Sequence, residues 1–419
     1  MRIVFLECKK ALNSPILIGL MILFACWNIY FIYDSSYFKE ELQVANEIAK
    51  TYGIHITDET LADLENEIDE SILRLNQLTE EKIGKTYESA TEFFTQISYE
   101  EQQQFTEDEL ESIANVAIQE MYVEQAQNIE DAYAQFNIEE IGEKEISSMG
   151  ITGQGAEILR KVNAKFSERF QELQENREHM QWFFSGKPYR MHSLLFRSVF
   201  RLIIIEALIL IVLATSLITN FEFENRTQLV TYVTKRGRTI MLDKLFASLT
   251  TSVLITTILL TITLGTYFLT FDYSHLWKTS INSGFNWEFI FPYVSWWDWS
   301  IGTYLMMGIF LTYVGIGLFS LLTFSVSVLL KNSYFTFATL AIFFIACLII
   351  PSYVPKNIIL ILSSFNLSTL LIAPHFWWMG TGSITSFKFY ELWTVIIWTL
   401  VLITFCYVSM KRFRKEDLT

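Results

Sequence analysis

The chain of 419 residues has few cysteines and prolines, and both are unevenly placed. Its 4 cysteines all lie in or beside long apolar runs, and none lies between residues 34 and 198. That segment also contains no proline before Pro188. Disulfides therefore cannot stabilise this segment. Long uninterrupted helices are permitted there, because proline breaks the interior of a helix.

Sequence motifs for nucleotide, metal and hydrolytic chemistry are missing as well. The chain has no G-x-x-x-x-G-K-[ST] pattern, so it lacks the loop with which P-loop proteins hold nucleotide phosphates. H-E-x-x-H, G-x-S-x-G and C-x-x-C patterns are also absent, and the 5 histidines are scattered without a metal-binding spacing. We therefore expect this chain to have no catalytic residues, no metal site and no enzymatic activity of its own.

Charge is concentrated in the cysteine-free segment. Residues 34–198 carry 34 acidic residues against 14 basic ones, a net charge of −20. The rest of the chain carries 11 acidic residues against 17 basic ones, a net charge of +6. An acidic polar domain is thus inserted into a weakly basic, apolar chain. Its acidic stretches lack the turn glycine of a calcium loop, so we expect them to form solvated helix faces.

The acidic segment has the patterns of long helices. In "TDETLADLENEIDESILRLNQL", five apolar residues recur at helical spacing, which indicates one buried face. They are Leu61, Leu64, Ile68, Leu75 and Leu78. In "FTEDELESIANVAIQEM", Thr106 and Glu109 form a capping-box pattern, which predicts the start of a second long helix.

Six apolar runs are each long enough to cross a bilayer, which takes about 20 helical residues. They cover residues 14–33, 199–219, 246–271, 302–330, 334–350 and 390–410. Residues 356–378 are also apolar, but serines, an asparagine and Pro374 interrupt them. A seventh span there would place the basic tail "KRFRK" outside the cell, against the positive-inside rule. We therefore predict an all-α polytopic membrane protein with six transmembrane helices, cytoplasmic termini, a large helical extracellular domain between helices 1 and 2, and short re-entrant or interfacial helices at 356–378.

Three ionisable residues in or beside the second apolar run are candidates for a translocation path. Glu206 lies well inside the run, where a carboxylate is costly and therefore a functional candidate. The alternative is a hydrogen-bonded glutamate that holds two helices together. Arg197 and Arg201 lie at the outer mouth of the same run, either as a substrate-facing basic rim or as part of an interfacial helix on anionic headgroups.

A compact charged block, "EFENRTQLVTYVTKRGRTIMLDK", occupies residues 222–244 between the second and third runs. Its acidic residues come first and its basic residues last, an order that suits the dipole of a helix. We therefore expect a short helix parallel to the membrane that a partner protein could bind. An ordinary charged loop is the alternative interpretation.

The order of these features resembles the permease subunits of ABC-2 type ABC transporters. The elbow helix of that family, with its E-x-K-K character, is similar to "LECKKALNSP", which contains Glu7, Lys9 and Lys10. Glu224 and Thr227 resemble the start of the family's coupling-helix block, although Asn225-Arg226 replaces the glycine usual before the threonine. Arg238 and Lys244 resemble the end of that block. The resemblance covers residues 1–33 and about 199–419.

The resemblance implies three parts: an elbow helix with the first span (1–33), an extracytoplasmic helical domain (34–198), and five further spans (199–419) that include the coupling block. The chain would be the permease subunit of a transporter that moves or extracts a peptide, antimicrobial or lipid-like substrate. A separate ABC ATPase subunit would bind ATP and Mg, and this chain would hold no cofactor. The implied ATPase-coupling residues are Glu222, Glu224, Thr227, Thr231, Tyr232, Arg238 and Lys244.

The other implied partners are a second permease copy or a paralogue and membrane lipids, with no nucleic acid. The expected location is the plasma membrane of a bacterium of the Gram-positive type. The competing hypothesis is a non-transporting membrane receptor or surface-interaction protein whose helical outer domain binds a ligand.

Overall fold

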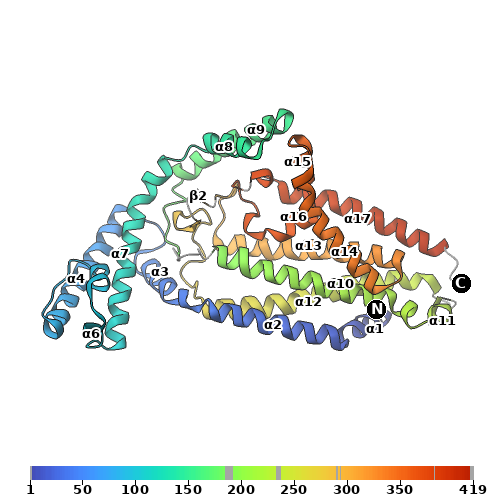
Figure 1. Cartoon of the computed structure of the whole chain (residues 1–419), viewed down its shortest axis with the longest axis horizontal. Helices are drawn as coiled ribbons and strands as arrows, with labels where there is room; N and C mark the ends of the chain where they lie inside the picture. Colours follow the sequence, from blue (N-terminus) through green and yellow to red (C-terminus); the bar gives the residue numbers. More distant parts are fainter. Residues whose placement is uncertain are drawn as a thin grey trace.

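The computed structural model describes residues 2–184, 192–232, 237–288, 291–292, 294–381 and 383–415, and these are mostly helical (Figure 1). Within these residues, six helices are long and apolar enough to cross a membrane, which confirms the predicted helical chain with six candidate spans. They are α2 (Pro15–Asp34), α10 (Arg201–Glu224) continuing the π-helical segment η2 (Ser193–Phe200), α12 (Ile240–Thr270), α13 (Ile301–Leu330), α14 (Ser333–Tyr353) and α17 (Tyr390–Lys415).

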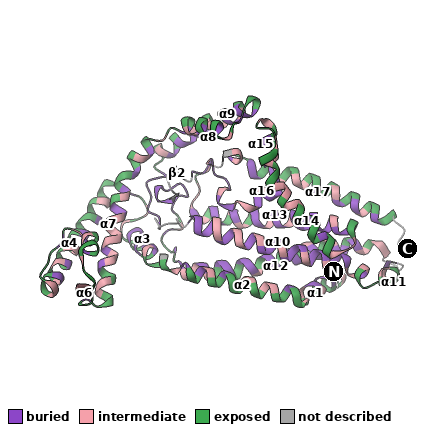
Figure 2. Cartoon of the chain, in the orientation of Figure 1, coloured by how far each residue is buried: buried purple, intermediate pink, exposed green. Residues whose placement is uncertain are grey.

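The six helices form one bundle with α10 at its centre, packed against α2, α12, α13 and α14. In the most apolar stretch of Ser193–Glu224, 72% of the residues are buried, against 11% for Ser333–Tyr353. Figure 2 shows the same contrast between α10 and the outward faces of α2, α14 and α17. The exposed side chains on these faces are largely apolar, as hydrocarbon requires; they include Ile22, Leu23, Trp27, Ile342, Ile345, Leu400 and Ile403.

Both ends of the described chain lie at one end of this bundle, which we call the termini end (Figure 1). The short helices α1 (Arg2–Leu12), α11 (Gln228–Tyr232) and η3 (Gly237–Thr239) lie there too. Residues 35–184, which we call the insert, extend from the opposite end. The insert contains η1 (Ser36–Phe38), α3 (Lys39–Tyr52), α4 (Asp58–Ile83), α5 (Ala90–Gln96), α6 (Tyr99–Gln102), α7 (Glu107–Ala134), α8 (Ile138–Met149) and α9 (Gly153–Glu175).

The helix patterns predicted for the insert are confirmed. Helix α4 buries Leu64, Ile68 and Leu75 from the expected apolar face. Helix α7 begins at the predicted capping box: the Glu109 amide donates to Thr106 Oγ1 (3.3 Å), and the Thr106 amide donates to Glu109 Oε2 (2.8 Å). These local signals suffice because a cap is completed within four residues.

The insert joins the bundle at a polar junction beyond α9. Glu178, which is buried, accepts two hydrogen bonds from the Arg169 guanidinium, at 2.8 and 2.6 Å. Its Oε2 also accepts one from Asn282 Nδ2 (2.7 Å), in the loop between α12 and α13. Apolar side chains continue across the junction, so the insert shares one hydrophobic core with the bundle instead of packing around a separate one.

A second contact lies at the start of α9. The Thr152 amide donates to the Lys356 carbonyl (2.8 Å). Beside it, a Cβ atom on Gly155 would stand 2.7 Å from the Asn357 carbonyl carbon, so glycine permits this close approach. Figure 1 shows the resulting arch of α3, α7, α8 and α9, which leaves the bundle beside α2 and returns at α15.

Residues 356–378 form short helices, as predicted: α15 (Ile358–Ser364), α16 (Leu367–Ile372) and the 3-10 turn η5 (Pro374–Phe376). Asn357 and Asn366 cap α15 and α16 by accepting from the amides of Ile359 (2.9 Å) and Thr369 (2.8 Å). The remaining described elements are the turns η4 (Gly284–Asn286) and η6 (Ser383–Thr385) and the antiparallel pair β1 (Trp287–Glu288) and β2 (Phe291–Pro292).

Candidate coupling site at the termini end

Four charged side chains from three helices form a largely buried ion-pair network at the termini end, in which Lys10 is half-buried. Lys244 of α12 lies 2.5 Å from Glu222 of α10 and 3.4 Å from Glu7 of α1. Lys10 lies 2.7 Å from Glu7 and 3.2 Å from Glu222. Each lysine thus contacts both glutamates, and the charges balance. The network fixes the position of α1 against two of the candidate spans, α10 and α12.

Removing these charges from water costs free energy. The exposed fraction is 0% for Lys244, 3% for Glu7 and 4% for Glu222. Lys244 Nζ also donates to the Ile218 carbonyl of α10. Burial alone would lower the pKa of Lys10, but its hydrogen bond and charge attraction to Glu7 and its interactions with Glu222 outweigh this effect and raise that pKa. A buried ion pair is maintained only when each charge keeps its partner, so the four residues act as one unit.

The expected helix start in the 222–244 block is wrong. Glu222 and Glu224 end α10 instead of beginning the short helix, whose acidic start we inferred from the helix dipole alone. The α10 helix can continue through Glu222 because Lys10 and Lys244 neutralise it. Glu224 Oε1 accepts the Ser333 amide (2.8 Å) and so caps the first turn of α14, where a negative charge is favourable.

The chain leaves α10 through a Schellman motif. The Thr227 amide donates to the Glu222 carbonyl (2.8 Å), and the Arg226 amide donates to the Phe223 carbonyl (3.2 Å). Arg226 has a φ of 57°, the left-handed conformation that glycine adopts most readily. Arg226 therefore occupies a position whose backbone conformation favours glycine.

Replacing Arg226 by glycine should stabilise the protein by up to about 1 kcal/mol, because glycine removes the steric cost of a left-handed residue. The measurement is equilibrium unfolding of the purified chain in detergent, followed by tryptophan fluorescence. Asn225→Gly is the matched control, since Asn225 has a φ of −90° and gains nothing from glycine. Equal or lower stability of the Arg226 variant would contradict the assigned conformation.

Tyr232 holds helix α11 against the bundle, and Arg238 of η3 binds the end of α17. The buried Tyr232 ring packs between Phe223 of α10 and Phe413 of α17, with ring centroids 5.8 and 5.3 Å apart. Arg238 Nη1 donates to the Phe413 carbonyl (3.4 Å) and to the Arg414 carbonyl. Through Tyr232, the short helix is therefore packed against the ends of two candidate spans.

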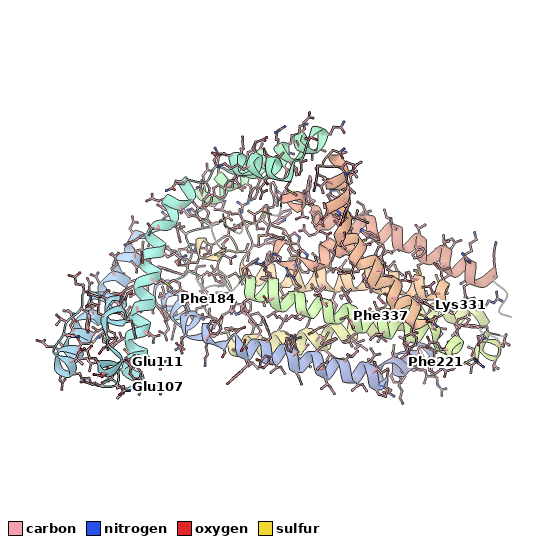
Figure 3. All side chains as sticks on the ribbon, viewed as in Figure 1. Glu107, Glu111, Phe184, Phe221, Lys331 and Phe337 are labelled. Carbon is pink, nitrogen blue, oxygen red and sulfur yellow. The ribbon has the colours of Figure 1, made fainter. Side chains whose placement is uncertain are left out.

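The outer side of α11 presents two apolar residues to solvent. Leu229 is 57% exposed and Val230 is 77% exposed, although the helix that carries them is fixed at Tyr232. We did not identify either residue from the sequence. The sequence shows these two apolar residues in the middle of a polar segment. Only their exposure in the structure distinguishes them from the buried Tyr232. They form a small apolar surface at the termini end, where Figure 3 labels Phe221 and Lys331 nearby on the bundle.

The structure therefore divides the predicted coupling residues into groups. Glu222 and Lys244 meet in the network, while Tyr232 fixes α11 and Arg238 attaches η3 to α17. Thr227 completes the exit from α10, and Thr231 lies half-buried within α11. Glu224 connects α10 to α14. The site carries no reactive constellation among these residues; its contacts connect α11 to α10 and α17, and connect α10 to α12 and α14.

Glu206 lies in a separate polar cluster within the bundle. Its Oε2 accepts a hydrogen bond from Asn28 Nδ2 of α2 (2.8 Å), which also donates to Thr263 Oγ1 of α12 (2.9 Å). All three residues are buried. These hydrogen bonds connect three helices, whereas the alternative interpretation of Glu206 expected it to hold two helices together. A role of Glu206 in translocation stays a prediction.

Arg197 and Arg201 lie at the insert end of the bundle, in and after the π-helical segment η2. Both are half-buried and close enough to His375 for their charges to act on its imidazole. His192 Nε2 lies 3.1 Å from the His375 carbonyl, which holds η5 beside this segment. The two arginines thus belong to a packed basic cluster, and their contact with a substrate stays a prediction.

Comparison with known proteins gives no relative: no family model, no curated protein and no solved structure matches this chain. The function therefore has to be argued from the geometry of the site and the topology of the bundle.

Proposed function

We propose that the chain is the membrane-spanning permease subunit of an ABC transporter and that α11 is its contact with a separate ATPase. One observation carries the proposal: the apolar side chains of Leu229 and Val230 are exposed at a helix whose other side is fixed to the bundle. Exposed apolar residues on a rigid support suit a protein interface. A chain that has no P-loop motif and presents such a surface is suited to be driven by another subunit's ATP hydrolysis.

The contacts around α11 supply the mechanical connection that this function needs. A force on α11 reaches α10 through Phe223 and α17 through Phe413. From α10, the buried ion network extends to α1 and α12, and Glu224 extends to α14. A partner that prefers one bundle arrangement when it binds ATP would shift the population of the spans by its differential affinity.

The proposal also gives the chain an orientation in the membrane and a set of partners. The termini end faces the cytoplasm and the ATPase, and the insert faces the outside of a bacterial plasma membrane. The partner subunit holds ATP and Mg, and a second permease copy or a paralogue completes the transporter within the lipid. The transported or extracted molecule is a peptide, an antimicrobial or a lipid-like compound.

The test is reconstitution of the full chain in nanodiscs with candidate ABC ATPase subunits from the same organism. We expect the two subunits to co-purify and the ATPase to hydrolyse ATP faster with the chain than with empty nanodiscs. A chain that neither retains the ATPase nor changes its rate is not a permease subunit, and the receptor hypothesis would then be preferred.

A further inference from the structure

A groove on the insert runs between helices α4, α5 and α7 and has a volume of ≈ 610 Å³. Its walls include four apolar side chains: Ile72 of α4 and Ala117, Ile118 and Met121 of α7. Ile118 and Met121 are half-buried in the groove wall. Methionine is unbranched and adaptable, and it suits surfaces that bind apolar groups of varied shape.

The ionisable residues lining the groove are both acidic. Glu120 accepts hydrogen bonds from the amides of Ala90 (2.7 Å) and Thr91 (3.0 Å), which fixes its carboxylate at the start of α5. Glu124 lies one turn further along α7, and its side chain is exposed. Among the described residues no ion pair involves Glu124, so its charge is available at the rim of the groove.

The surroundings reinforce this negative charge. Residues 58–134, which include α4 to α7, carry 21 acidic residues and 3 basic ones, a net charge of −18. Two of the three basic residues are engaged, since Lys82 pairs with Glu109 (2.5 Å) and Lys85 pairs with Glu101 (2.6 Å). Figure 3 labels Glu107 and Glu111 on α7 at this end of the molecule, far from the termini end. Such a single-sign field attracts cationic ligands over a range of about 10 Å at moderate salt.

We propose that this groove binds a cationic amphipathic peptide. The apolar side of the peptide packs against Ile72, Ile118 and Met121. Its lysine or arginine side chains face Glu124 and the carboxylate of Glu120. Apolar walls with an acidic rim match that chemistry, whereas an acidic lipid headgroup or an acidic protein surface would be repelled by the −18 charge.

This inference deepens the proposed function by naming a substrate class for the insert, but the binding step itself requires no ATPase. The two ideas can therefore fail separately. Peptide binding without any effect of the chain on an ATPase would leave a peptide receptor, and ATPase stimulation without peptide binding would leave a permease for another substrate.

The test measures binding of a fluorescent amphipathic peptide of lysine and leucine to the full chain in phosphatidylcholine nanodiscs, with empty nanodiscs as background. We expect saturable binding that Glu124→Lys weakens about tenfold or more, because a like charge then faces the peptide. Met121→Ser should also weaken binding, and Glu139→Lys is the matched control. Glu139 is an exposed acid of α8, so that variant changes the net charge equally and should bind normally.

Three results would overturn the proposal. A glutamate–leucine peptide that binds as tightly would remove the charge argument. A serine–leucine peptide that binds as tightly would indicate a site for lipid or for a second copy of the chain. Normal binding by both Glu124→Lys and Met121→Ser, with unchanged thermal unfolding, would place the peptide elsewhere on the molecule.

Discussion

Replacing Lys244 by methionine should lower the free energy of unfolding by about 3 kcal/mol or more, because a buried ion network would lose one of its two positive charges. Glu7 and Glu222 would share Lys10 alone, and the Ile218 carbonyl would lose the Nζ donor. The apolar part of the side chain is kept, so the loss reports on charge more than on packing. Equilibrium unfolding of the purified chain in detergent measures it, with the fluorescence of the 11 tryptophans as the signal.

Two further variants separate charge from volume in this experiment. Adding Glu222→Gln to the Lys244 variant removes the excess negative charge and should restore most of the lost stability. Lys9→Met is the matched control, because Lys9 is exposed on α1 and should change stability by no more than about 0.5 kcal/mol. If Lys244→Met were as stable as Lys9→Met, the network would contribute nothing to the position of α1.

Replacing both Leu229 and Val230 by aspartate should weaken binding of the ATPase subunit about 30-fold or more. If α11 inserts into the partner, each aspartate places a charge where an apolar contact is buried, and a central interface residue commonly contributes about 2 kcal/mol. The stability of the isolated chain should hardly change, since both side chains are exposed. The measurement is the dissociation constant of the ATPase for the chain in nanodiscs, together with the stimulated rate of ATP hydrolysis.

Leu73→Asp is the matched control for the α11 variant. Leu73 is an apolar residue of α4 that is 65% exposed, but it lies in the insert, at the other end of the molecule. This variant should bind the ATPase as tightly as the original chain. The coupling assignment of α11 fails if the double aspartate variant does the same.

The parts of the fold that depend on neighbouring residues could be predicted from the sequence. The apolar face of α4, the capping box at Thr106 and the six long apolar runs each occupy one continuous stretch. Their ends were less predictable. The α10 helix continues to Glu224 although its last turn carries two acids, because the partners that offset Glu222 come from α1 and α12.

The contacts of the candidate site were even harder to predict from the sequence. Glu7 and Lys244 are far apart in sequence, and their contact depends on how α1 packs against α12. The charged block showed which residues are polar, but it could not distinguish buried Glu222 from exposed Glu224, or buried Tyr232 from exposed Val230. Tyr232 is buried because its ring packs against Phe413 of α17, a residue far from it in the sequence.

The contact between α9 and α15 gives the insert a mechanical role at its own end of the bundle. From α2, the chain passes through the helices of the arch and rejoins the membrane part where Thr152 meets Lys356 (Figure 1). A helix has a fixed rise of about 1.5 Å per residue, so such a path resists stretching. A widening between α2 and α15 would therefore bend the arch at its turns, separate α3 from α7, or break the Thr152 hydrogen bond. The insert thus opposes opening at this mouth of the bundle through packing contacts and one hydrogen bond.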